Sequence, residues 1–274
     1  MRTIDTGTDD LLGEVADGVA TLTMNRPERR NAMSGPMNQA LARALADAEM
    51  ADDVGCVVLT GAGGAFCAGG DVKGMASGGD GGGGAPTSYD AGVHRQRLNQ
   101  RAISQRLHEM PKPTIAAIPG AAAGAGFSLA LACDLRYAVP GAILTTAFAK
   151  VGFAGDYGGT WFLTRLVGSG KARELYYFSD KLSAEDAERL GIVNAILPAE
   201  TFADDVAAKA RQLAAGPTVA YRYMKENLNR AVHGELGECL DMEAAHHIRT
   251  GQTDDHREAA KAFVEKRPPT FTGR

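Results

Sequence analysis

Short apolar runs, separated by helical stretches, recur along the chain. Residues 19–24 alternate in the manner of a half-buried strand, and Pro27 marks the end of that strand because proline cannot donate to a strand ladder. Other apolar runs predict strands at 56–60, 114–118 and 135–139. Strands of this kind that alternate with helices predict a layered α/β fold whose sheet is buried on both faces.

Helices are predicted in the first half of the chain over 34–48 and 92–110. Pro111 and Pro113 end the second helix before the next strand, because the residue that precedes a proline avoids the helical conformation. Residues 74–86 contain so many glycines that few side chains could be buried, and this burial would not compensate for the entropy lost when the segment becomes ordered. We expect that segment to be mobile.

The C-terminal part of the chain is strongly helical in composition. Its helical sequence is interrupted at Gly216 and again near Gly251. We therefore predict a core over 1–199 and a C-terminal helical region over 200–274.

Composition narrows the classes of function. A formal net charge of −4 and a pI near 5.9 give no basic surface for nucleic acid. No stretch approaches the roughly 18 uninterrupted apolar residues of a membrane span, and the first residues lack the apolar core of a signal peptide. The four cysteines form no CxxC pair, which favours buried thiols over disulfides or a zinc site. We expect a cytoplasmic protein with neither a nucleic-acid partner nor a membrane anchor.

Two glycine-rich turns, at 61–71 and 120–126, each follow an apolar strand and lead toward a helix. Small residues let a ligand approach the backbone, and N–H groups at such a turn can point at developing negative charge. Two turns of this kind could supply the two convergent donors of an oxyanion hole. The alternative is that both are tight turns that only permit close packing of helix on strand.

One carboxylate, Asp156, stands among small and apolar residues at 151–160. Desolvation there would raise its pKa toward the working range of a general base. The alternative is a turn residue that caps its own backbone. The histidines at 233, 246 and 247 have no carboxylate or cysteine at metal-ligand spacing, so no metal site is predicted.

Several segments, taken in order, resemble motifs of the crotonase (enoyl-CoA hydratase/isomerase) superfamily. An Asn-Arg-Pro opening and two oxyanion segments are followed by later motifs, so that the matches run through nearly the whole chain. The matching segments are 25–32, 66–73, 113–126, 133–138, 158–168, 187–193 and 263–271. On these ordered matches the protein is identified as a member of that superfamily.

The resemblance implies a ClpP/crotonase-like spiral of ββα units and a role in acyl-CoA and fatty acid metabolism. The substrate is an acyl-CoA thioester, so coenzyme A enters as part of the substrate and no separate cofactor is expected. The oxyanion donors carried over by position are the backbone N–H groups of Gly70 and Ala125. The C-terminal helices are expected to form a homotrimer or a dimer of trimers, a hexamer.

At two positions the sequence departs from the family pattern in a way that favours isomerisation over hydration. Hydratases of the family activate water with two glutamates, and their positions hold Ser128 and Phe148 in this sequence. The setting of Asp156 resembles the Gly-x-x-x-Asp-x-Gly-Gly-Thr pattern of double-bond-shifting and ring-forming isomerases of the phenylacetate pathway. An enoyl-CoA isomerase with Asp156 as acid-base is therefore favoured. The alternatives are an enzyme for an epoxide or other aromatic-derived acyl-CoA, a hydratase by family similarity, and a non-catalytic acyl-CoA-binding scaffold.

The resemblance also assigns positions that bind the CoA part of the substrate. Arg26 and Arg30 would place cations near the phosphates, and the C-terminal helices would bring Phe263 and Lys266 to a neighbouring subunit's ligand. The alternative is that residues 253–267 form a solvated terminal helix. The positions assigned to CoA binding are Arg26, Arg30, Ala68, Asp71, Phe263 and Lys266.

Truncation after Thr253 is expected to weaken both trimer assembly and CoA affinity. Lys266→Ala should weaken CoA binding alone, and less so at high salt, where its charge is already screened. Light scattering and calorimetric titration measure the two effects. A truncated protein that still forms trimers and binds CoA normally would refute a site completed by a neighbouring subunit.

Overall fold

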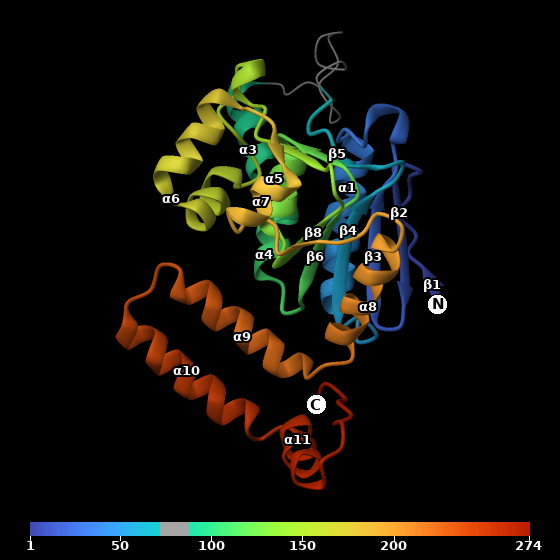
Figure 1. Cartoon of the computed structure of the whole chain (residues 1–274), viewed down its shortest axis with the longest axis vertical. Coiled ribbons are helices and arrows are strands. Elements are labelled where there is room, and N and C mark those ends of the chain that lie inside the picture. Colours follow the sequence, from blue (N-terminus) through green and yellow to red (C-terminus); the bar gives the residue numbers. More distant parts are fainter. Residues whose placement is uncertain (72–87) are drawn as a thin grey trace.

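The computed structural model describes residues 1–71 and 88–274, and the segment predicted to be mobile, 74–86, falls outside the described residues. A seven-stranded sheet in the order β1-β2-β3-β4-β6-β8-β11 forms the centre of the core (Figure 1). β1 to β3 are antiparallel, and every pair from β3 to β11 is parallel. The strands are β1 (Arg2–Thr3), β2 (Leu11–Ala16), β3 (Val19–Met24), β4 (Cys56–Gly61), β6 (Thr114–Ile118), β8 (Leu135–Ala138) and β11 (Ala195–Ile196).

A second sheet of four short strands, in the order β10-β9-β7-β5, lies beside the first. Its strands are β5 (Ala65–Cys67), β7 (Ala121–Ala123), β9 (Ile143–Thr145) and β10 (Leu182–Ser183). Along the chain, β4, β6 and β8 of the large sheet are each followed by a strand of the small sheet, namely β5, β7 and β9. This alternation is the predicted spiral of ββα units.

Helices cover both faces of the large sheet, as its continuous apolar strands predicted. Leu22, Leu59 and Ile118 face the larger hydrophobic cluster, to which α1 contributes, whereas Val58 and Ile115 face α8 on the other side. The predicted helix at 92–110 is observed as α3, the π-helical turn η2 and α4. The helices of the core are α1 (Gly35–Met50), α3 (Tyr89–Gln100), η2 (Arg101–Gln105), α4 (Arg106–Glu109), α5 (Ala125–Ala132), α6 (Gly159–Phe178), α7 (Ala184–Arg189) and α8 (Phe202–Ala214), with short 3-10 turns η1 (Pro27–Arg29) and η3 (Ala149–Val151).

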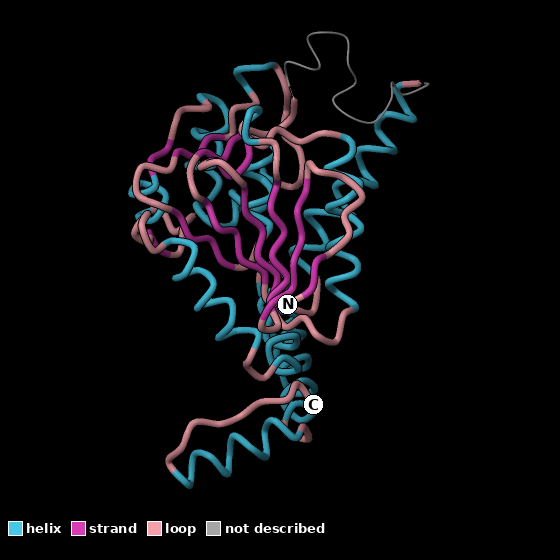
Figure 2. Tube along the Cα trace, turned by 90° about the vertical axis from the view of Figure 1, so that its right-hand side faces the viewer, coloured by secondary structure: helices cyan, strands magenta, loops and turns pink. Residues whose placement is uncertain are grey.

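The last three helices project from the core as an arm (Figures 1 and 2). They are α9 (Thr218–Ala231), α10 (Leu236–Thr250) and α11 (Asp254–Glu265). The predicted break at Gly216 separates α8 from α9, and the one near Gly251 separates α10 from α11, whereas the break between α9 and α10 was not predicted. The arm carries many exposed large apolar side chains, among them Leu228, Leu240 and Phe263. α8 lies within the region predicted as C-terminal, but it packs on the core sheet. None of the helices in the described part is both long and apolar enough to cross a membrane.

A buried lysine joins the arm to the core. Lys225 of α9 donates from Nζ to the carboxylate of Asp134 at 2.8 Å and to the carbonyl oxygens of Leu107 and Lys112, each at 3.1 Å. Asp134 also accepts from the N–H of Thr114 at 2.8 Å. All three ammonium protons therefore have acceptors, which compensates for the desolvation of the charge.

Lys225→Met is expected to lower the free energy of unfolding by about 3 kcal/mol, because it leaves a partly buried carboxylate without its cation. Urea denaturation measures the loss. Arg222→Met on the same helix is the matched control, because its ion pair with Glu226 is exposed and should contribute little. Equal losses in the two variants would contradict the role given to Lys225.

Candidate active site

The two glycine-rich turns lie side by side at one edge of the small sheet. β5 and β7 are parallel neighbours with Cys67 opposite Ala122, so the segments that leave their carboxyl ends emerge together. Gly69 has a φ of +90°, and a Cβ there would lie 2.8 Å from the Ala123 oxygen and 3.3 Å from the Ala125 nitrogen. Only glycine permits this approach of the two backbones.

The predicted oxyanion donors belong to these turns. Ala125 is the first residue of α5, so its N–H has no acceptor within the helix. Within the described part of the chain, neither the Gly70 nor the Ala125 N–H donates a hydrogen bond. Within that part of the chain, each group is therefore without an internal acceptor and could donate to a ligand atom such as a thioester oxygen. Their assignment as substrate donors stays a prediction.

The opening motif clamps the first of these turns. Met33 N–H donates to the Gly69 oxygen at 2.8 Å, and Ala68 N–H donates to the Arg30 oxygen at 2.9 Å. The Arg26 guanidinium donates to the Ala32 oxygen at 2.7 Å. The first two bonds tie residues 68 and 69 to the opening motif, and the third fixes Arg26 within that motif.

The residues assigned to CoA binding fall into two groups in space. The first group lies at the first turn and comprises Arg30, Ala68 and Asp71. Arg26 lies beside it, and its partly buried guanidinium pairs with Asp71 at 3.4 Å and with Asp10 at 3.7 Å. Arg26 therefore already serves as an internal cation. Phe263, which is 85% exposed, and Lys266 lie at the end of the arm and are not brought to the turns within one chain (Figure 1).

Asp156 is held in the loop between η3 and α6. Its backbone oxygen accepts from the Gly159 N–H at 3.0 Å, and the next residue, Tyr157, is buried with a left-handed φ of +47°. Its Oδ1 is buried and has no hydrogen-bond partner among residues 1–71 and 88–274. Burial raises the pKa of this carboxyl from an ordinary 3.8 to about 6. This agrees with the desolvation predicted from its apolar neighbours in the sequence.

Two stacked aromatic rings border the space between the second turn and Asp156. The rings of Phe148 and Tyr176 are 5.9 Å apart and nearly parallel, at 8°. A Cβ at Gly124 would lie 3.9 Å from the Phe148 ring, and a Cβ at Gly155 would lie 3.2 Å from the Tyr176 ring. Burial raises the pKa of Tyr176, and the charge of Asp156 raises it further.

The two positions that hold glutamates in the hydratases are thus occupied by groups that cannot act as a carboxylate base. Ser128 is buried and donates from its hydroxyl to the Gly124 oxygen at 3.3 Å, and Phe148 is part of the ring stack. The sequence did not point to Tyr176, because nothing in its position on α6 signals that the helix returns to the Asp156 loop.

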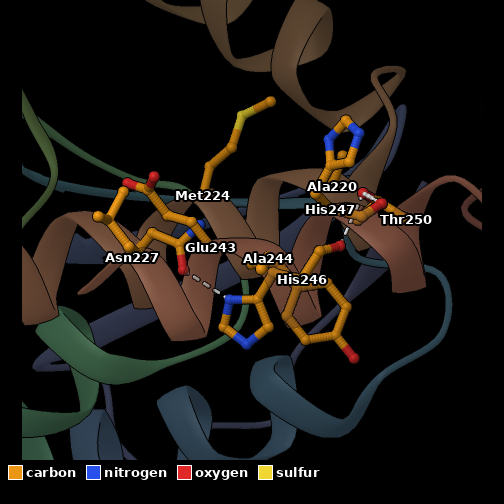
Figure 3. A pocket seen from close by; sticks show the side chains of 10 residues that line it. Ala220, Met224, Asn227, Glu243, Ala244, His246, His247 and Thr250 are labelled. Atoms are coloured by element: carbon orange, nitrogen blue, oxygen red, sulfur yellow. Dashed lines mark hydrogen bonds between the residues drawn. The ribbon is translucent and has the colours of Figure 1, made fainter. Parts of the chain in front are cut away.

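Two hollows are lined by residues outside the glycine-rich turns. One of about 440 Å³ is bordered by α3, η2, α4 and the start of α6, and it reaches Gly158 in the loop that carries Asp156. His108 packs edge-on against Trp161 there. The other, of about 510 Å³, lies between α9 and α10, where His246 Nδ1 is 2.6 Å from Asn227 Oδ1 (Figure 3). Among the described residues there is no cluster of three or more His, Cys, Asp or Glu side chains that could hold a metal.

The sequence matches the family model described as Enoyl-CoA hydratase/isomerase over residues 14–274. It is 40% identical over 264 residues to the 1,2-epoxyphenylacetyl-CoA isomerase of Escherichia coli (strain K12), which covers 96% of this chain and 98% of that protein. The enoyl-CoA hydratase of Polaromonas sp. JS666 has a similar structure, with a TM-score of 0.88, 32% identity and coverage of 96% and 99%. The enoyl-CoA hydratase of Bacillus anthracis gives a TM-score of 0.87, 30% identity and coverage of 97% and 100%.

Asp156→Asn is expected to stabilise the protein at neutral pH. Since the unfolded chain ionises at a lower pH than the folded one, wild-type stability falls as the pH rises from about 4 to about 6 and is constant above. Over this pH range the free energy of unfolding of the wild-type protein falls by at most about 3 kcal/mol. Urea denaturation near pH 4 and near pH 8 should show a small gain for the variant at the lower pH and the full gain at the higher.

Asp180→Asn, at a carboxylate whose side chain is 79% exposed, is the matched control and should show no such gain. A gain for Asp156→Asn that is the same at both pH values would mean that the carboxyl is not desolvated.

Proposed function

The chain belongs to the enoyl-CoA hydratase/isomerase family, and within it we propose an isomerase-type enzyme that shifts the double bond of an enoyl-CoA. One observation carries this choice. Asp156 presents a partly buried carboxyl of raised pKa beside the paired turns, while Ser128 and Phe148 stand where hydratases have their glutamates. A single acid-base group suits proton transfer between carbons, whereas hydration needs groups that bind and activate water.

In the proposed reaction, the Asp156 carboxylate removes a proton from C2 of a 3-enoyl-CoA. The electron pair moves into the thioester, and the resulting enolate oxygen accepts hydrogen bonds from the N–H groups of Gly70 and Ala125. Asp156 then returns the proton at C4, so that the double bond lies between C2 and C3 and the enzyme is regenerated. Each donor would contribute about 3 kcal/mol of transition-state stabilisation.

The pKa of about 6 suits this cycle. The group is ionised at neutral pH and so can accept a proton, and it is a stronger base than an exposed aspartate. The Phe148–Tyr176 stack supports the same choice, because it borders the site with apolar ring faces and offers no carboxylate to orient a water.

A second candidate substrate is an epoxide of an aromatic acyl-CoA. It is favoured by the relative at 40% identity, which is a 1,2-epoxyphenylacetyl-CoA isomerase. The same base and the same pair of donors would serve, and the two substrates differ in the shape of the acyl group.

We also propose a cytoplasmic homotrimer or dimer of trimers. The exposed apolar side chains of α9 to α11 support an assembly in which the arms pack against neighbouring subunits. Such packing would bring Phe263 and Lys266 to a neighbour's CoA, which a single chain does not do. The acidic net charge supports the absence of a nucleic-acid partner.

Purified protein is expected to convert a 3-enoyl-CoA into the conjugated 2-enoyl-CoA, followed by the absorbance of the conjugated thioester. The same protein should hydrate crotonyl-CoA poorly or not at all, because both water-activating carboxylates are missing. kcat/KM for isomerisation should rise with pH through about 6 and then level off, as the base ionises.

Asp156→Asn is the control for this prediction, and it should abolish isomerisation while leaving acyl-CoA affinity largely intact. Robust hydration by the native protein would overturn the isomerase proposal, and wild-type-like isomerisation by the variant would overturn the assignment of the base.

A further inference from the structure

We propose that Cys67 is a positioning residue for the oxyanion hole: its side chain fixes the first turn against the second and so sets the relative direction of the Gly70 and Ala125 N–H groups. The inference rests on the proposed function for the identity of the hole. Three contacts of this one side chain support it.

The first contact is with the turn that carries Gly70. Cys67 is the last residue of β5 and is fully buried, and its Sγ accepts the N–H of Gly69 at 3.4 Å. The thiol also lies 4.0 Å from the Gly69 oxygen. Because the chain at Gly69 is bound on both its N–H and its C=O, the peptide that follows, which bears the Gly70 N–H, is restricted in orientation.

The second contact is with the helix that carries Ala125. A Cβ at Gly126 would lie 2.5 Å from the Cys67 Cβ and 2.8 Å from its Sγ. The cysteine side chain therefore fills the space directly beside the first turn of α5. A smaller side chain would leave a gap between the turns, and a larger one would displace α5.

The third contact is electrostatic. Burial raises the pKa of the Cys67 thiol to about 12, and the nearby charge of Asp156 contributes to the rise. The thiol thus stays neutral, which excludes a nucleophilic role and leaves hydrogen bonding and packing as its function. One side chain is therefore close to all three proposed parts of the site, the two turns and Asp156.

Cys67→Ala, Cys67→Ser and Cys56→Ala test the proposal. Alanine removes the acceptor and leaves a gap, whereas the serine hydroxyl can still accept the Gly69 N–H. Cys56 is the matched control, because it is also fully buried but belongs to the cluster on the α8 side of the large sheet. Urea denaturation of each variant separates effects on the site from effects on stability.

Kinetically, Cys67→Ala is expected to lower kcat for isomerisation about 100-fold, as expected for misplacement of the catalytic groups, with little change in KM. Cys67→Ser should recover most of the lost activity, and Cys56→Ala should retain wild-type kcat.

A bound chromophore provides a readout that does not depend on turnover. The conjugated thioester of cinnamoyl-CoA absorbs at longer wavelength when its carbonyl oxygen accepts strong hydrogen bonds. Wild-type protein, Cys67→Ser and Cys56→Ala should all shift this band, and Cys67→Ala should lose at least half of the shift.

A full shift with Cys67→Ala, or the same loss with Cys56→Ala, would overturn the role of Cys67. Absence of a shift with the wild-type protein would overturn the oxyanion hole and this inference with it. A wild-type shift without any isomerisation would overturn the proposed reaction alone, because the comparison among the variants would still support or refute Cys67.

Discussion

The candidate site depends on the close approach of two backbone turns, which at Gly69 leaves no room for a side chain. Gly69 comes so near to the second turn that a methyl group there would collide with the Ala123 oxygen and press closely on the Ala125 nitrogen. The approach is possible because β5 and β7 are parallel neighbours and because the bonds of Met33 and Ala68 hold the first turn from outside. In the proposed reaction, separation of the turns would prevent the two N–H groups from binding the same enolate oxygen.

Burial of the Asp156 carboxyl is the second constraint, and it opposes stability. An unpaired buried oxygen and a pKa near 6 both mean that the ionised form is less stable here than in water. The fold retains this unfavourable group in a loop secured by the buried Tyr157 and the start of α6. Functional groups are commonly kept at such a cost, because the same desolvation that destabilises the carboxylate makes it a better base.

The sequence predicted the parts of the molecule whose signals are local. Strand β3 was predicted with its observed bounds from its alternating pattern, and β6 from its apolar run. The small neighbours of Asp156 correctly indicated desolvation. The three-residue strands β5, β7 and β9 could not be predicted, because they lie in alanine- and glycine-rich segments without periodicity. Contacts between distant segments were equally hidden. Examples are the Phe148–Tyr176 stack and the pairing of Arg26 with Asp10 and Asp71, which depend on how the spiral folds back on itself.

The buried ammonium of Lys225 has a consequence for association. Because it binds one carboxylate and two carbonyl oxygens of the core, it fixes the direction in which α9 leaves the core before any other chain is present. The exposed apolar face of the arm is thereby preorganised, so a subunit that covers it need not restrict the motion of a loosely hinged helix. In the proposed assembly, part of the entropic cost of association would therefore be met during folding of the single chain, and α9 would act as a fixed template for the partner rather than as a flexible tether.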